Sequence, residues 1–302
     1  MKYFKTQPSR MAPRYQITYE NFQNITECKQ PFEQRNSTGE FSQYAICPSC
    51  LNPIQIIGLS PGSKISPYGR HTGKNINGFP KWQQKSYEYC PFADKSERIK
   101  PNENFEILDI NENIRELYNL LKNQFDRVIY VISKELGMRF SGNFIKTALQ
   151  QFLNNHMYCY PWLTESNLPY IFMYRGMHQQ NIIGQQFLID SPIYNALIKH
   201  VNVTFCKNNR SQNSNYLMLA NKNNYLKLQL RFSSHSQHSI NGKNLKETVK
   251  IYVDDMIADK TIYSAILEFD EMFFINLISK QFTSDKRQQW ILNIATELML
   301  GI

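Results

Sequence analysis

The sequence predicts an α+β protein in two parts, a small module over residues 1–105 and a larger domain over residues 106–302. Three observations carry this prediction. Turn dipeptides such as Pro61-Gly62 crowd the first hundred residues, apolar residues recur at helical spacing after Asp109, and apolar and charged residues alternate after Leu226. Helices followed by strands and again by helices are typical of an α+β domain.

The N-terminal module is expected to contain only short strands. The sequence favours strands at Gln43–Ile46, Pro53–Leu59 and Ser86–Tyr89, with Gly and Pro between them. A unit with such short apolar segments buries little core, so we expect it to need a cross-link of some kind.

The larger domain is expected to begin with a long helix. Apolar residues from Ile114 to Leu136 recur at intervals of three and four. Asp109 or Asn111 is available as the N-cap, and Gly137 is a suitable terminator.

A second central helix is expected from Ser141 or Asn143, and it must end before Pro161 because proline breaks a helix. The pair Ser191-Pro192 predicts the start of a further short helix, with a capping residue followed by proline at the first helical position.

An antiparallel sheet is expected next. Apolar and polar residues alternate over residues 226–232 and again over residues 249–253, and a turn signal, Asn241-Gly242, lies in the long connection between them. Thr261–Phe269 is expected as another strand. The chain is then expected to close with two helices, Glu271–Gln281 and Ser284–Leu300.

The charge balance points to an anionic partner. Lys and Arg outnumber Asp and Glu by 34 to 25, which favours nucleic acid, DNA or RNA, over a membrane surface. No stretch approaches the ~18 consecutive apolar residues that span a bilayer, and the N-terminus lacks an apolar signal region. We therefore expect a cytoplasmic protein without a membrane partner, in a compartment where thiols stay reduced.

Six cysteines in such a compartment favour a metal site accompanied by free thiols. Cys47 and Cys50 lie two residues apart, and His71 and Cys90 follow beside turn residues. Zn²⁺ takes four thiolate or imidazole ligands in a tetrahedron, which these four residues supply. Because all four positions are filled by protein, the expected Zn²⁺ site is structural. Cys28 is a possible substitute ligand, and the rival interpretation is that these cysteines are small buried apolar residues.

The spacing of these ligands resembles that of zinc ribbons and zinc knuckles in general, over about the first hundred residues. The resemblance implies a zinc-ribbon-like module.

Basic and aromatic residues interleave around the same segment, as in surfaces that bind phosphates and stack bases. A further basic set lies on the polar face of the expected hairpin. The alternatives are a solvated surface whose aromatic residues pack the module, and the wet side of a half-buried sheet. The expected nucleic-acid-binding residues are Arg70, Lys74, Lys81, Trp82 and Lys85 in the module, and Lys227, Arg231 and Lys250 in the larger domain.

No motif for nucleotide hydrolysis, dinucleotide binding or a serine nucleophile occurs. His235 and His238 fall in a Ser-rich segment that we interpret as a turn. A metal-dependent nuclease would draw on these histidines and on four carboxylates, although no spacing among them matches a known motif. The four carboxylates are Asp254, Asp255, Glu268 and Asp270.

The sequence therefore predicts a non-catalytic, nucleic-acid-associated protein with a structural zinc site, and a subunit of a prokaryotic nucleoprotein assembly that also has protein partners. Two alternatives stay open, a metal-dependent nuclease and a protein-interaction scaffold whose charge serves solubility.

Overall fold

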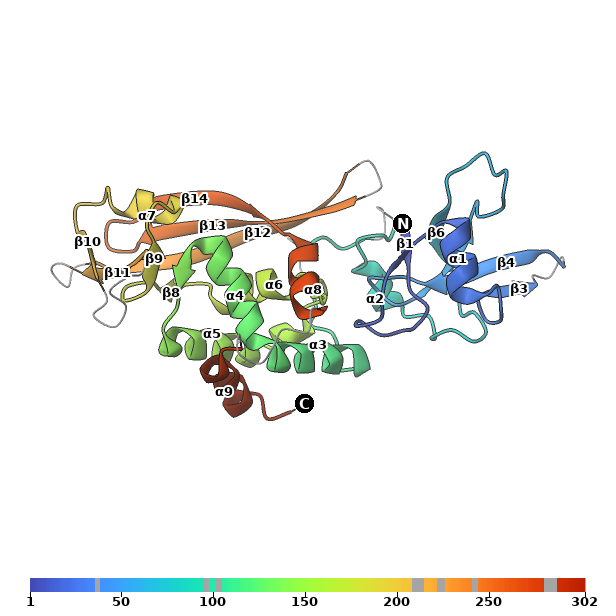
Figure 1. Ribbon diagram of the computed structural model, residues 1–302, viewed down its shortest axis with the longest axis horizontal. Coiled ribbons are helices and arrows are strands. Elements are labelled where there is room, and N and C mark those ends of the chain that lie inside the picture. The colour runs from blue at the N-terminus through green and yellow to red at the C-terminus, as the bar shows by residue number, and fades with distance from the viewer. Residues whose placement is uncertain are drawn as a thin grey trace. The chain divides into compact units, whose positions relative to one another are not determined.

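The computed structural model has a mixed α/β architecture, with nine α-helices and several antiparallel sheets among the residues it describes (Figure 1). Two compact units can be distinguished. Unit 1 comprises residues 1–106 and 237–246, and unit 2 comprises residues 107–236 and 247–302. The described residues are 1–35, 39–94, 98–101, 105–207, 215–221, 226–240, 244–279 and 287–301.

Unit 1 is built on a four-stranded antiparallel sheet in the order β3-β4-β5-β6. A two-stranded ribbon, β1 with β2, and two helices accompany it. The elements are β1 (Tyr3–Phe4), β2 (Tyr15–Gln16), α1 (Tyr19–Thr26), β3 (Glu33–Arg35), β4 (Phe41–Ile46), β5 (Pro53–Ile57), β6 (Tyr68–His71) and α2 (Gln84–Glu88).

The strand expected at Ser86–Tyr89 is wrong, because this segment lies in and directly after helix α2. The helical turn instead lets Tyr87 pack against neighbouring rings while Tyr89 is buried, and Cys90 N–H closes the turn on the Tyr87 carbonyl at 2.8 Å.

Unit 2 contains most of the helices. They are α3 (Glu112–Asn123), α4 (Phe125–Leu136), α5 (Gly142–Asn154), the 3₁₀ turn η1 (Met157–Cys159), α6 (Leu168–Gly176), α7 (Pro192–Leu197), α8 (Glu271–Ser279) and α9 (Gln289–Leu298).

The single helix expected from Ile114 to Leu136 is two helices, because the backbone breaks at Gln124. Apolar spacing concealed the break, since α3 and α4 both bury their apolar stripes and the stripe continues across it. The N-cap is Asn111, and Gly137 ends α4 with a φ of 61°.

Helix α6 was not predicted. Nearly all of its residues are buried, so it lacks the one-sided apolar pattern that reveals a helix in sequence. The caps expected at Ser141 and Ser191 do begin α5 and α7.

Two antiparallel sheets complete unit 2, in the orders β10-β11-β9-β7 and β14-β13-β12-β8. Their strands are β7 (Met138–Arg139), β8 (Gln180–Asn181), β9 (Gln186–Leu188), β10 (Val203–Cys206), β11 (Tyr216–Asn221), β12 (Leu228–Ile240), β13 (Asn244–Asp255) and β14 (Lys260–Glu268).

The alternation that predicted this sheet is confirmed, because Leu228, Leu230, Val249 and Ile251 are all buried. The prediction of a long connection between the two strands is wrong. Strands β12 and β13 extend to within three residues of each other, and the Asn241-Gly242 turn lies outside the described residues.

His235 and His238 both lie in strand β12, so the prediction of a Ser-rich turn around them is wrong as well. Residues 237–246 are grouped with unit 1.

Helices α8 and α9 overlap the two predicted C-terminal helices, while residues 280–286 between them lie outside the described part. In the described residues, no helix combines the length and the apolar character needed to cross a membrane.

Candidate metal centre

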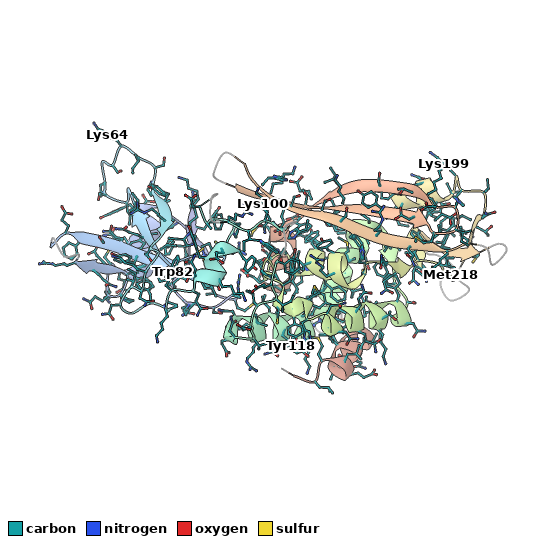
Figure 2. All side chains as sticks on the ribbon, turned by 180° about the vertical axis from the view of Figure 1, so that it is seen from behind. Lys64, Trp82, Lys100, Tyr118, Lys199 and Met218 are labelled. Atoms are coloured by element: carbon teal, nitrogen blue, oxygen red, sulfur yellow. The ribbon has the colours of Figure 1, made fainter. Side chains whose placement is uncertain are left out.

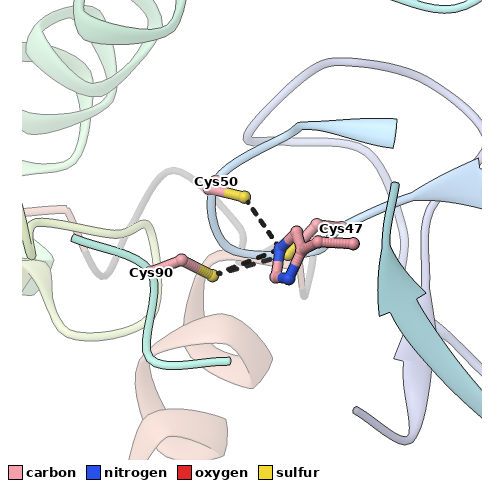
Figure 3. A group of neighbouring side chains, drawn as sticks. Cys47, Cys50 and Cys90 are labelled. Atoms are coloured by element: carbon pink, nitrogen blue, oxygen red, sulfur yellow. Dashed lines mark hydrogen bonds between the residues drawn. The ribbon is translucent and has the colours of Figure 1, made fainter. Parts of the chain in front are cut away.

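Four side chains of unit 1 converge on one point, and they are Cys47, Cys50, His71 and Cys90. Their ligand atoms all lie within 4.8 Å of one another. The sulfur atoms of Cys47 and Cys90 are 3.7 Å apart, and His71 Nε2 lies 3.2 Å from the sulfur of Cys50 and 3.7 Å from that of Cys90. Figure 3 shows the sulfur atoms of Cys50 and Cys90 directed toward this common point.

These separations match a tetrahedral site. With Zn–S bonds of about 2.3 Å, two sulfurs on a tetrahedron lie about 3.8 Å apart, and a sulfur and a nitrogen somewhat closer. The four side chains could therefore hold a metal ion.

A tight turn between β4 and β5 aims the first two sulfurs. Cys47 N–H donates to the Asn52 carbonyl at 2.9 Å, and Leu51 N–H donates to the Cys47 carbonyl at 3.1 Å. Leu51 closes the turn at a φ of 60°, a conformation that is strained for a bulky side chain. Its side chain is buried, so packing offsets part of this strain.

The other two ligands arrive from β6 and α2. His71 is the last residue of β6, paired with Ile54 of β5, so the sheet places its ring beside the turn. The ring packs edge-to-face on Tyr87 at 4.9 Å and on Trp82 at 6.2 Å. Cys90 lies two residues after the end of α2 and is buried.

Asn52 supports the site from outside the ligand set. Its amide nitrogen lies 3.5 Å from the sulfur of Cys50 and donates to the Gln83 carbonyl at 2.9 Å. Its amide oxygen accepts from Gln83 N–H at 2.7 Å. This buried side chain thus clamps the segment before α2 to the turn. Sequence reasoning missed it, since a lone Asn after a Cys carries no distinguishing pattern.

The thiols strongly influence one another without a metal. Burial raises the pKa of Cys50 and of Cys90, and the neighbouring Cys47 raises both further. Burial also works to raise the pKa of Cys47, but hydrogen bonds from Cys50 and Cys90, together with the neighbouring His71, outweigh it and lower that pKa well below its usual value. Such competition for protons is what a bound cation relieves.

The ligands are also part of the core of unit 1. The buried cluster around them includes Phe4, Phe22, Ile54 and Ile56 together with Cys47, Cys50 and Cys90. Cys28 packs against this cluster but does not belong to the converging group.

The expected nucleic-acid-binding residues of unit 1 differ in how far their side chains are exposed or bonded to other residues of the protein. Arg70, Lys74 and Lys81 are exposed, and the Arg70 guanidinium donates to the Gln55 side chain at 3.2 Å. Lys85 pairs with Glu106 at 2.9 Å. Trp82 is half-buried against Tyr87 and His71, so its ring contributes to packing around the site.

In unit 2, Lys227 and Lys250 are exposed, but Arg231 is committed to its own sheet. Its guanidinium bonds the carboxylate of Asp254 and lies 3.9 Å from the centre of the Tyr252 ring. Hence Arg231 is a less suitable phosphate contact than the two lysines.

The four carboxylates of the nuclease alternative do not converge. Asp254 accepts from Arg231 and Thr261, and these bonds outweigh burial to lower its pKa. Asp255 accepts from two backbone N–H groups of the next turn and lies 3.2 Å from His200. Asp270 accepts from the N–H of Phe273, three residues along. Over the described ranges, the Cys47 group is the one cluster of three or more potential ligands.

His235 belongs instead to a closed polar network in unit 2. The Tyr160 hydroxyl accepts a hydrogen bond from Arg175 and is hydrogen-bonded to His235 Nδ1 at 3.0 Å. His235 Nε2–H then donates to Glu247 at 2.6 Å, and Asn167 donates to the same carboxylate oxygen at 3.1 Å. With His235 and Glu247 fully buried, this network is structural.

Cys159 is also not a nucleophile of the kind that reacts at neutral pH, because burial raises its pKa to about 11. The nearby His156 bonds the Tyr158 hydroxyl through Nδ1.

No protein-family model, curated protein or solved structure matches the chain.

Proposed function

We propose that Cys47, Cys50, His71 and Cys90 bind one Zn²⁺ ion and that this ion is structural. Three thiolates and one imidazole are the donor set that Zn²⁺ prefers, and a filled tetrahedron leaves no position for an activated water. Two ligands come from the turn between β4 and β5, one from the end of β6 and one from the segment after α2. This arrangement around a small sheet supports a zinc-ribbon-like module.

We further propose that the zinc-bound unit associates with nucleic acid. One observation carries this proposal: residues 41–87, which include three of the four ligands, contain five Lys and Arg and no Asp or Glu. Within that segment Arg70, Lys74 and Lys81 are exposed. An exposed basic patch on a rigid support concentrates polyanions, and each phosphate it neutralises releases counterions.

The proposed role is non-catalytic, as a subunit of a nucleoprotein assembly. The carboxylates of Asp254, Asp255 and Asp270 accept hydrogen bonds from other groups of the protein, which supports a non-catalytic role.

The test is the salt dependence of binding to single-stranded and duplex DNA and RNA by the zinc-loaded full-length chain. The double variant Lys74→Glu with Lys81→Glu should weaken binding and reduce the slope of log K against log salt by about 2, because each lost phosphate contact removes roughly 0.9 from the slope on duplex DNA.

The matched control is Lys199→Glu with Lys207→Glu, two exposed lysines of unit 2 that carry the same change in charge. This control should bind more tightly than the Lys74 and Lys81 variant, and both should retain zinc. An equal loss in the two variants, or no binding by the native chain at low salt, would refute the nucleic-acid proposal.

A further inference from the structure

The sheet of unit 1 has one face that its buried cluster does not cover. Successive side chains of a strand point to opposite faces of a sheet. In β5, Ile54 and Ile56 belong to the buried cluster, which also contains Phe22 of helix α1. Gln55 and Ile57 therefore point to the opposite side, and both are only half-buried. We call this second side the outer face.

Strand pairing brings an arginine and two tyrosines to the outer face. Tyr44 of β4 pairs with Gln55, and Gln55 pairs with Arg70 of β6, so the three side chains form one row across the sheet. The next row contains Ile57 and Tyr68. Arg70 and Tyr68 lie two residues apart in β6, so they are neighbours on this face, about 7 Å apart along the strand.

The side chain of Tyr68 is available to a ligand. It is half-buried, and within the described part of the chain it takes part in no hydrogen bond and no ring contact. Tyr44 differs, because its ring packs edge-to-face on Phe79 at 6.4 Å. Arg70 is exposed, and its guanidinium donates to the Gln55 side chain at 3.2 Å, which holds it against the sheet.

The charges of the outer face complement a phosphate chain. Lys64, which is labelled in Figure 2, lies in the loop between β5 and β6, and Lys74 lies three residues after β6. Both lysines are exposed. Glu33, the one acidic residue of β3 to β6, lies on the opposite face, because it pairs with Gln43, and Gln43 pairs with Ile56 of the buried cluster. Phosphates that approach the outer face therefore meet cations.

These features favour an unpaired strand over a duplex. The bases of a duplex are stacked on one another, so a ring on a flat sheet reaches the phosphates of a duplex but not its base faces. An unpaired base can stack on an aromatic side chain while basic side chains follow the strand's phosphates.

We propose that the outer face of β4, β5 and β6 binds single-stranded nucleic acid, with one base stacked on Tyr68 and an adjacent phosphate bound by Arg70. The inference deepens the proposed nucleic-acid function and rests on it. It names the form of nucleic acid that is bound and the surface that binds it.

The experiment measures binding of oligo-dT, oligo-U and a DNA duplex to the zinc-loaded full-length chain by fluorescence anisotropy. The native chain should bind the single strands more tightly than the duplex. Tyr68→Ala should weaken single-strand binding by about tenfold, the effect of one lost stacking contact, and should leave duplex binding unchanged. Tyr68→Phe keeps the ring and should bind the single strands as the native chain does.

Tyr19→Ala is the matched control, since Tyr19 is 42% exposed and lies in α1, the helix on the side of the buried cluster. This variant should keep the native affinity. Zinc content and the thermal midpoint of each variant separate lost binding from lost folding. An equal loss in Tyr68→Ala and Tyr19→Ala, or in Tyr68→Ala and Tyr68→Phe, would overturn the stacking contact.

An abasic strand tests the same contact without changing the protein. It keeps the phosphates of oligo-dT but offers no base to Tyr68. The native chain should bind it about tenfold more weakly than oligo-dT, and Tyr68→Ala should bind the two strands alike.

The failure of this inference differs from that of the proposed function. Equal affinity of the native chain for the abasic and intact strands would overturn the stacking surface. The proposed function would survive that result if Lys74→Glu with Lys81→Glu still weakened binding. Absence of binding to every nucleic acid at low salt would refute both.

Discussion

The two units bury different kinds of side chains in their cores. In unit 1, three of the ten residues of the buried cluster are the cysteines of the candidate metal centre. Unit 2 instead buries large apolar side chains, among them Trp162, Phe125, Phe152 and Phe172. Several of its buried polar side chains, His235, Glu247 and Asn167, are hydrogen-bonded to one another in one network. If the proposed zinc ion is bound, unit 1 depends on it for stability, whereas unit 2 relies on apolar burial, as expected for a small unit and a larger one.

The largest expected effect comes from removing a ligand. Cys47→Ser should abolish stoichiometric zinc and leave residues 1–106 open to protease, because structural zinc supplies on the order of 10 kcal/mol to the folding of a small module. Unit 2 should remain folded. Metal analysis and limited proteolysis with mass mapping provide the measurements.

Cys28→Ser is the matched control, because Cys28 packs against the same cluster but lies outside the converging group. This variant should retain its zinc. If it loses zinc while Cys47→Ser keeps it, the ligand set is wrong.

The next largest effect should fall on unit 2 alone. Glu247→Ala leaves the Nε2–H of His235 and one of the two amide N–H groups of Asn167 without an acceptor, which should cost about 3 kcal/mol of unfolding free energy. Glu247→Gln retains an acceptor oxygen and should cost less, about 1 kcal/mol.

Chemical denaturation followed by tryptophan fluorescence measures both variants, with zinc content as the second readout. Zinc should stay bound in each. A loss of zinc in either variant would contradict the independence of the two units.

The smallest effect concerns the support of the ligands. Asn52→Ala removes the donor near the sulfur of Cys50 and both bonds to Gln83. Competition with a chelator should show zinc affinity about 10- to 100-fold lower, as is typical for residues that orient metal ligands. Gln83→Ala should have no effect, because Gln83 contributes only backbone atoms to this clamp. Equal losses in both variants would show that Asn52 has no specific role.

Part of this structure could be predicted from the sequence, for physical reasons that differ between elements. The two-residue spacing of Cys47 and Cys50 signals a turn with converging sulfurs, and the structure does bring His71 and Cys90 to them. The alternation around Leu228 and Leu230 likewise predicts a half-buried sheet. Both patterns are local, so a single segment of sequence contains them.

The rest depends on contacts between distant segments. The break at Gln124 is invisible because the apolar stripe continues through it, and α6 is invisible because it is buried on all sides. The pairing of His235 with Tyr160 joins residues 75 positions apart, and no local pattern announces it. The same holds for the clamp between Asn52 and Gln83.

The most direct test of the account is hydrogen exchange of the full-length chain before and after removal of its metal by a chelator. We expect the chelator to release one equivalent of zinc. Exchange should become faster only in residues 1–106, and the protection of α3 to α6 should be retained. Unchanged protection of the β4–β5 turn after metal loss would contradict it, as would a preparation that is free of metal yet protected throughout unit 1.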